Sequence, residues 1–169
     1  MDFYPRPQFE RKAWLDLDGS WSFDFDDQKT GIDNKWYEVH EYTKEIKVPF
    51  VYQSGESGIN CQETHDCVWY NKVITLEEKS APRILLHFGA SDYYTQVWVN
   101  GAYCGDHRGG HTPFSFDISS KIKDDRQLKI DVCVIDYSSD ENLPRGKQNF
   151  KGKSEGIFYT GSTGIWQSV

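Results

Sequence analysis

Hydrophobic and polar residues alternate with a period of two along most of this chain. Trp21, Phe23 and Phe25 alternate with polar residues, and the same pattern is most regular over residues 128–134. Because successive side chains of a strand point to opposite faces, this period predicts β-strands. Further strands are predicted at residues 45–50, 67–76, 83–88, 95–99, 111–118, 156–160 and 164–169.

Turn residues connect these strands. Asn100-Gly101 lies between two strand-like runs, and this pair predicts a tight hairpin because both residues tolerate a positive φ. No window of a dozen residues has helical periodicity, and only one helical turn fits, near residues 33–37. Short strands separated by Gly- and Pro-containing turns predict an antiparallel all-β fold, a two-sheet sandwich such as a jelly roll.

Composition narrows the class of partner. The chain has 169 residues, enough for one domain, and 15% of them are aromatic, which predicts an aromatic-rich core. The net charge of -7 disfavours nucleic acid and anionic membrane surfaces as partners. No apolar run approaches the roughly 20 residues that span a bilayer. We therefore expect no nucleic-acid partner and no membrane partner.

The beginning of the chain and its cysteines bear on localisation. Residues 1–7 lack the apolar core of a secretory signal peptide. The four cysteines have no disulfide-framework spacing, and reduced cysteines in a cytoplasmic protein are the simpler interpretation. A piece cut from a secreted precursor would look the same. A cytoplasmic location is the expectation.

No motif places catalytic groups. Asp24, Asp26 and Asp27 are predicted to form a solvated strand face and turn, and no carboxylate pair is placed for glycoside hydrolysis. The Gly-x-Ser-x-Gly elbow, a phosphate-binding Gly loop and His-Glu-x-x-His are all missing. The sequence predicts neither a catalytic residue in this chain nor a cofactor.

Two Cys/His spacings are candidates for metal sites. The spacing Cys104-x-x-His107-x-x-x-His111 is compatible with metal binding, but Gly109-Gly110 inside it indicates a turn instead. The set Cys61, His65 and Cys67 is the weaker of the two. The prediction is that the chain has no metal site.

The end of the chain has two notable features. Residues 136–155 form a long polar stretch, which is either a functional loop or a solvated connection. Residues 165–169 have a strand pattern that stops abruptly, so we expect the chain to be a piece of a longer protein.

A set of motifs, taken in order, resembles a known family. The chain is similar to the N-terminal sugar-binding domain of glycoside hydrolase family 2, the family of β-galactosidase, β-glucuronidase and β-mannosidase. The resemblance covers nearly the whole chain, from about Arg11 to Val169, and rests on Leu17-Asp-Gly-Ser-Trp-Ser-Phe23, Ile46-Lys-Val-Pro49, Val68-Trp-Tyr70, Val97-Trp-Val-Asn-Gly101 with Gly105-Asp-His107, Gly110-His-Thr-Pro-Phe-Ser-Phe-Asp-Ile118, Pro144-Arg-Gly-Lys-Gln148 and Ser162-Thr-Gly-Ile-Trp-Gln-Ser-Val169.

The resemblance implies a jelly-roll β-sandwich of the galactose-binding-like type, one domain over residues 1–169. In full-length members an immunoglobulin-like domain and a TIM barrel follow, and the barrel carries two catalytic glutamates. The chain alone is therefore expected to be inactive. Its expected role is that of a non-catalytic accessory domain that shapes the sugar pocket of a retaining glycosidase acting on a β-galactoside or a β-glucuronide.

The resemblance also implies candidate residues. In β-galactosidase relatives, loops of this domain contribute an Asn and an Asp to the sugar pocket. Asp140 lies where such an Asp would come, and Asn60 is the weaker match for the Asn, with Gln62 or Glu63 as alternatives. Arg145, Lys147 and Gln148 are further candidates for contacts with the sugar or the barrel, or else for packing against neighbouring domains.

Two other functions stay open at this point. The chain could be a self-sufficient carbohydrate-binding module or a β-sandwich that binds proteins. The expected partners are a carbohydrate through the parent enzyme, the parent's own downstream domains, and a second copy in a homo-oligomer.

Overall fold

The computed structural model describes residues 13–76, 83–123, 126–149, 151 and 153–169. The prediction that residues 1–7 are not a signal peptide lies outside the described residues. Regular structure here consists of β-strands and the short 3-10 helices η2 (Gly55–Ser57) and η3 (Ser119–Lys121). Within the described part of the chain, no helix has the length and apolar character needed to cross a membrane.

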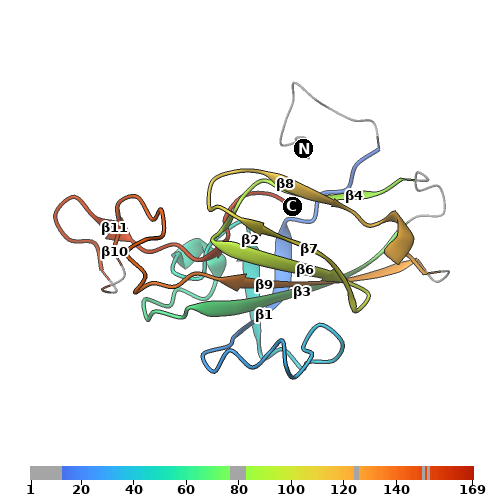
Figure 1. The fold of residues 1–169 in the computed structure, drawn as a ribbon, viewed down its shortest axis with the longest axis horizontal. Helices are drawn as coiled ribbons and strands as arrows, with labels where there is room; N and C mark the ends of the chain where they lie inside the picture. The colour runs from blue at the N-terminus through green and yellow to red at the C-terminus, as the bar shows by residue number, and fades with distance from the viewer. Residues whose placement is uncertain (1–12, 77–82, 124–125, 150, 152) are drawn as a thin grey trace.

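A six-stranded antiparallel sheet forms the larger layer (Figure 1). Its two longest strands are neighbours in the middle of the sheet and pair over their whole length. In spatial order the strands are β2 (Lys44–Val48), β1 (Gly19–Phe25), β3 (Cys67–Thr75), β9 (Gln127–Ile135), β6 (Tyr94–Val99) and β7 (Ala102–Arg108).

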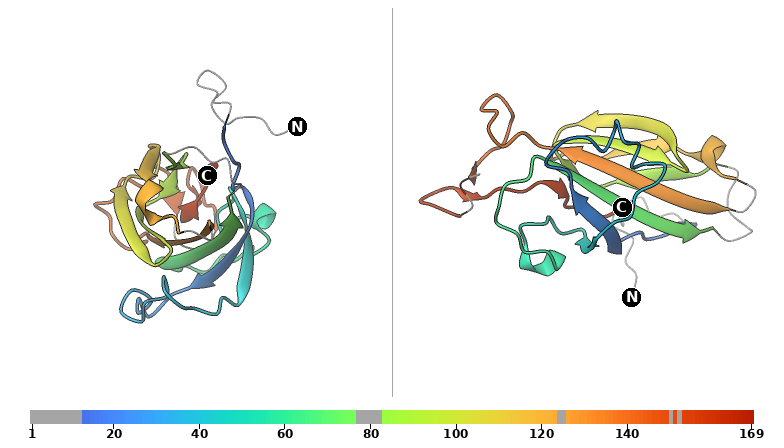
Figure 2. Two further views of the ribbon diagram at one scale, coloured as in Figure 1. Left: turned by 90° about the vertical axis from the view of Figure 1, so that its right-hand side faces the viewer. Right: turned by 90° about the horizontal axis from the view of Figure 1, so that it is seen from below.

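Short strand pairs form the opposite layer. β4 (Leu85–Phe88) pairs with β8 (Phe114–Asp117), and β5 (Ser91–Asp92) pairs with β12 (Gly164–Ile165). The large sheet curves around these pairs (Figure 2). Alternate side chains of the two layers meet in one apolar core that contains, among others, Trp21, Phe23, Val68, Tyr70, Phe88, Val132 and Ile165. The fold is the all-β sandwich of the jelly-roll kind that the strand spacing predicts.

Most strand predictions are confirmed, and so is the hairpin prediction, but of the strand predicted at 164–169 only β12, Gly164–Ile165, forms. Asn100 and Gly101 have φ values of 53° and 79° and connect β6 to β7. Cys104 and His107 lie within strand β7 rather than in a turn, whereas His111 lies in the turn before β8. Of the strand predicted at 156–160, only β11 (Tyr159–Thr160) forms. It pairs in parallel with β10 (Gln148–Asn149), which lies within the long polar stretch predicted at residues 136–155.

The prediction of a solvated face and turn is right for Asp27, which is exposed, and wrong for Asp24 and Asp26. Both carboxylates are buried, because the segment 26–43 folds over the outer face of the large sheet. There Trp36, Tyr37 and Tyr42 pack on a second cluster around Trp69 and Trp98. Polar and apolar residues alternate with a period of two whether the outer face of the sheet meets water or protein. Alternation alone therefore does not predict that the segment 26–43 covers this face.

Asp26 holds this cover in place. Its carboxylate accepts hydrogen bonds from the backbone N–H groups of Thr30 and Gly31, at 3.0 and 2.8 Å, and from the indole Nε1 of Trp69 at 3.2 Å. Each of these donors would lose its partner without the carboxylate. An unpaired buried polar group costs about 1–3 kcal/mol.

We expect Asp26→Ala to lower the free energy of unfolding by about 2–4 kcal/mol, because several buried donors lose their acceptor together. Chemical denaturation followed by tryptophan fluorescence measures this change. Asp33→Ala, at an exposed position of the same segment, is the control and should stay within about 0.5 kcal/mol of the parent chain. A loss as small for Asp26→Ala as for the control would contradict the assignment.

Candidate functional site at one end of the sandwich

A projecting segment, residues 140–161, extends from one end of the sandwich and is called the tongue (Figure 1). β10 and β11 form its two arms, with Gln148 opposite Tyr159. The Tyr159 N–H donates to the Lys147 carbonyl at 2.8 Å, and the Gly161 N–H donates to the Asn149 carbonyl at 3.2 Å. The long polar stretch predicted from sequence thus has structure of its own.

Four of the predicted site residues lie on the tongue. The Asp140 carboxylate accepts hydrogen bonds from the backbone and the side-chain amide of Asn142, which lower the pKa of Asp140. Nη1 of Arg145 donates to the Ser138 carbonyl at 3.4 Å, and Lys147 is exposed. The fifth predicted residue, Asn60, is exposed in a separate loop before β3.

Gln148 fastens the tongue to the sandwich. Its Nε2 donates to a carboxylate oxygen of Asp92, in β5, at 2.8 Å. Its Oε1 accepts from the backbone N–H of Ser162 at 2.6 Å. The side-chain amide of Gln148 therefore joins three separate parts of the chain: the tongue, β5 and the segment that begins at Ser162. Of the predicted site residues, Gln148 takes part in this hydrogen-bond network.

A second link lies beside the first. The Thr163 hydroxyl donates to Oδ2 of Asp136 at 2.8 Å, while the Thr163 N–H donates to Oε1 of Gln53 at 3.3 Å. Burial and, after it, the charge of nearby Asp92 raise the pKa of Asp136 to about 7; the Thr163 hydrogen bond opposes the shift. Burial also raises the pKa of Asp92, against the opposing effects of Gln148 and His111.

A cavity of about 360 Å³ opens next to this network, and its wall includes Phe50, Ser54, Asp92, His111, Ser162 and Trp166. The Trp166 indole N–H donates to the Gly110 carbonyl at 2.7 Å. A Cβ at Gly110 would lie 2.3 Å from an oxygen of Asp92, so only glycine lets the backbone pass here. An aromatic ring, a carboxylate, an imidazole and hydroxyls are groups that bind sugar hydroxyls and C–H faces.

Sequence reasoning missed Asp92, Asp136 and Thr163. Asp136 comes directly after the most regular apolar strand of the chain. A carboxylate in that position is the sequence signal that could have indicated a site residue. Asp92 lies in Gly-Ala-Ser-Asp, which was interpreted only as a turn. The predicted metal candidates Cys104, His107 and His111 do not converge: His107 is within hydrogen-bonding distance of the Thr112 hydroxyl, and His111 packs against the edge of Trp166.

Comparison with known proteins identifies the family. Residues 15–160 match the family model described as "Glycosyl hydrolases family 2, sugar binding domain". The chain belongs to this family. It is 32% identical over 163 residues to a β-glucuronidase of Canis lupus familiaris, an alignment that covers 88% of this chain and 25% of the relative. A β-glucuronidase of Paenibacillus borealis is 28% identical over 146 residues, covering 85% of this chain and 24% of the relative.

Solved structures agree with the sandwich fold. A Lactobacillus rhamnosus β-glucuronidase superposes with a TM-score of 0.67 at 27% identity, over 77% of this chain and 22% of the other. A Ruminococcus gnavus β-glucuronidase in complex with D-glucaro 1,5-lactone gives a TM-score of 0.70 at 23% identity, over 91% and 28%, and supports the fold alone. The chain spans about a quarter of the length of the curated relatives it matches.

The family resemblance seen in the motifs is therefore confirmed, and the chain is a sugar-binding domain of family 2 glycosidases. The relatives and solved structures named above are β-glucuronidases, and they give the β-galactosidase alternative no support.

The raised pKa of Asp136 predicts a pH-dependent stability. The pKa of this carboxyl is about 3.9 in the unfolded chain and about 7 in the folded one. Between these two pH values the native state binds more protons than the unfolded state, so the free energy of unfolding falls as pH rises from about 4 to 7. Asp136→Asn removes that slope and keeps an acceptor for Thr163. We expect the variant to be more stable than the parent above pH 7, by on the order of 1–3 kcal/mol, with the difference vanishing near pH 4.

Urea unfolding at a series of pH values measures this difference. Asp140→Asn is the matched control, because Asp140 lies on the tongue outside the buried network and its pKa is lowered rather than raised. A stability difference for Asp136→Asn that does not change with pH would contradict the assignment.

Gln148→Ala is expected to release the tongue, since it removes both the bond to Asp92 and the bond to Ser162. Hydrogen exchange of the amides at residues 147–161 should become about tenfold faster or more, while exchange in β3 and β9 stays unchanged. Gln167→Ala, which truncates an exposed glutamine elsewhere, should leave the exchange of the tongue unaltered. Unchanged exchange in Gln148→Ala would show that other contacts hold the tongue.

Proposed function

We propose that this domain is the accessory domain of a larger β-glucuronidase-type retaining glycosidase, and that its tongue helps form the sugar pocket of that enzyme. The proposal rests on the match to the family model and on relatives that are named β-glucuronidase and are about four times as long as this chain. The catalytic glutamates would come from a downstream barrel, as the family resemblance implies. The chain alone would then not hydrolyse glycosides.

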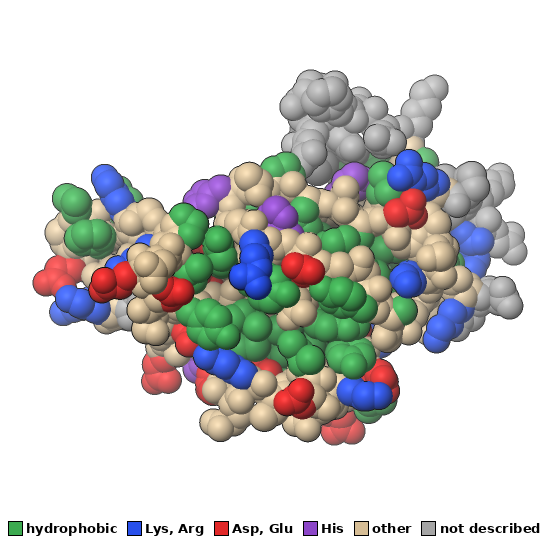
Figure 3. Space-filling view, in the orientation of Figure 1, with side chains coloured by type: hydrophobic (Ala, Val, Ile, Leu, Met, Phe, Trp, Pro, Cys, Tyr) green, Lys and Arg blue, Asp and Glu red, His purple; other side chains and the backbone are tan. Residues whose placement is uncertain are grey.

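The shape of the tongue supports an accessory role. The turn at residues 155–158, here called the tip, exposes Ile157 and Phe158, and Tyr159 beside it in β11 is exposed as well; 67%, 46% and 66% of their surfaces are accessible. Figure 3 shows apolar side chains at the end of the tongue, away from the body of the domain. Contiguous exposed apolar surface marks contact sites for proteins or ligands. Packing against another domain of the parent enzyme would cover these side chains.

The charges of the tongue suit an acidic sugar. Although the chain as a whole carries a net charge of -7, the tongue has one more basic than acidic residue: Arg145, Lys147, Lys151 and Lys153 against Asp140, Glu141 and Glu155. A glucuronide carries a carboxylate, and Arg pairs with carboxylates through two parallel N–H···O bonds. A galactoside has no such group. This contrast favours a glucuronide over a galactoside as the parent's substrate.

The cavity beside Trp166 and Asp92 favours a second candidate, a self-sufficient carbohydrate-binding module. Such a module would bind a glycoside without any further domain. The third candidate, a β-sandwich that binds proteins, would show itself through self-association by way of the apolar tip. Light scattering after size-exclusion chromatography separates a monomer from a homo-oligomer.

The proposal predicts flat calorimetric titrations of the isolated chain with methyl β-glucuronide and methyl β-galactoside, and no hydrolysis of the p-nitrophenyl glycosides. In the full-length product of the gene, Arg145→Ala should raise the KM for p-nitrophenyl β-glucuronide about tenfold, as expected for the loss of one charge-assisted hydrogen bond. Lys35→Ala, which removes an exposed cation paired with Glu38, should change nothing.

Saturable binding by the isolated chain would establish the self-sufficient module instead. A gene product without a barrel, or a KM that does not respond to Arg145→Ala, would overturn the accessory role on glucuronides.

A further inference from the structure

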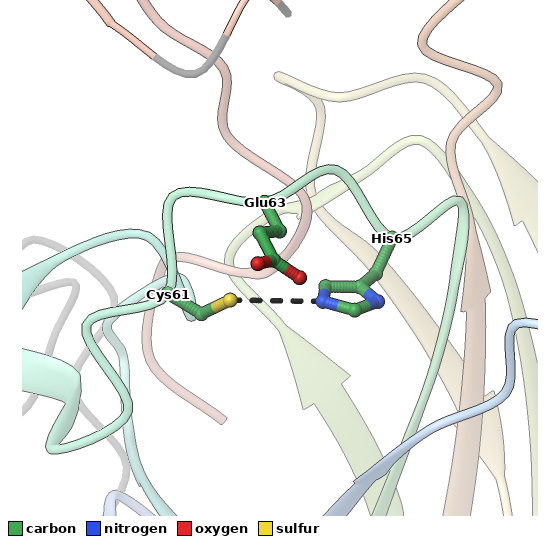
Figure 4. A group of neighbouring side chains, drawn as sticks. All are labelled: Cys61, Glu63 and His65. Atoms are coloured by element: carbon green, nitrogen blue, oxygen red, sulfur yellow. Dashed lines mark hydrogen bonds between the residues drawn. The ribbon is translucent and has the colours of Figure 1, made fainter.

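Three side chains with metal-binding atoms converge in the loop between η2 and β3. Sγ of Cys61, a carboxylate oxygen of Glu63 and a ring nitrogen of His65 all lie within 4.8 Å of one another. Figure 4 shows the three side chains on the same side of the loop, with the Glu63 carboxylate above the line from Cys61 to His65. The loop arches from Cys61 over Glu63 to His65, so the three side chains point towards one another (Figure 4).

Tyr52 fixes the path of this loop. Its backbone carbonyl accepts from the Cys61 N–H at 3.1 Å. Its hydroxyl accepts from the His65 N–H at 3.0 Å and lies 3.3 Å from the Glu63 carbonyl, to which it donates. The Tyr52 ring is buried in the core, so a rigid part of the molecule holds the backbone of all three residues.

The His65 ring is oriented from its other side. Nδ1 lies 2.7 Å from Oδ1 of Asp27, and the ring stacks on Phe25 at 3.7 Å between centroids. A carboxylate only accepts, so Nδ1 carries the proton and the lone pair of Nε2 is directed towards Sγ of Cys61, 3.6 Å away. Carboxylates orient the histidine ligands of zinc sites in this way.

We propose that Cys61, Glu63 and His65 bind a divalent ion of the zinc class. Zn–S and Zn–N bonds of about 2.3 and 2.0–2.1 Å at a tetrahedral angle place sulfur and nitrogen about 3.5–3.6 Å apart. The observed separation of 3.6 Å matches. Thiolate and imidazole select zinc over magnesium or calcium, and the fourth position is left for water. This proposal replaces the prediction, made from sequence, that the chain has no metal site.

The structure also changes the set of ligands. Cys67, weighed from sequence with Cys61 and His65, instead lies in β3 with its sulfur 3.6 Å from that of Cys133. Glu63 takes the third position. Glu63 also borders a small pocket with Asn149 and Thr160, at the root of the tongue. The ion would therefore brace the loop that supports the tongue, whichever sugar the parent enzyme binds.

Cobalt(II) added to the reduced chain tests the proposal, because a cobalt–thiolate bond gives a charge-transfer band in the near ultraviolet and tetrahedral cobalt gives strong visible bands. We expect one equivalent to bind and one equivalent of zinc to displace it. Cys61→Ser should abolish the charge-transfer band, and Asp27→Asn should weaken zinc binding about 10–100-fold. Cys104→Ser, at a half-buried cysteine in β7, is the matched control and should bind like the parent chain.

Thermal unfolding keeps the test independent of folding defects. Zinc should raise the Tm of the parent chain and of Cys104→Ser, and should not raise that of Cys61→Ser, whose metal-free Tm shows whether it is folded. A charge-transfer band that survives Cys61→Ser would overturn the proposal. The rate at which an alkylating reagent modifies Cys61 is a second check, because a bound ion should protect the thiolate. If zinc does not slow this alkylation, the proposal is overturned, and Cys61 and His65 are a hydrogen-bonded thiol–imidazole pair without a metal.

Discussion

The antiparallel pairing of β3 with β9 is the constraint on which the rest of the structure depends. The two strands pair from Cys67 with Ile135 to Thr75 with Gln127, in the middle of the large sheet. This register brings the start of β3 and the end of β9 to the same end of the sandwich, where the Asp136 N–H donates to the Asp66 carbonyl at 2.9 Å. The loop with Cys61, Glu63 and His65 and the segment that becomes the tongue therefore begin side by side.

Buried carboxylates behave in two ways in this domain. Asp26 receives several N–H donors, and its charge is matched by the hydrogen bonds that fasten the cover over Trp69. Asp136 receives the Thr163 hydroxyl and faces the charge of Asp92, so its pKa rises to about 7. The first arrangement fastens the cover to the sheet. In the second, burial disfavours a charge that is not fully compensated, so we expect the stability of this end of the sandwich to depend on pH.

The tongue is fastened at its root and apolar at its tip. Gln148 connects the root to Asp92 through a partly buried hydrogen bond, and Thr163 makes buried hydrogen bonds to Gln53 and Asp136. The tip exposes Ile157 and Phe158, and Tyr159 beside it is exposed as well. A rigid base with an apolar end suits a part that reaches towards another domain, which agrees with an accessory role in a larger glycosidase.

Local pattern determined the strands, the Asn100-Gly101 hairpin and the family, because alternation, turn chemistry and motif order are properties of neighbouring residues. Only the tertiary structure decided that Asp24 and Asp26 are covered, since alternation is the same against water and against protein. It also decided that Gln148 meets Asp92, 56 positions away, and that Glu63 rather than Cys67 stands with Cys61 and His65. These contacts depend on how the β3–β9 register and the hydrogen bonds of Tyr52 direct two loops, and that information is not local.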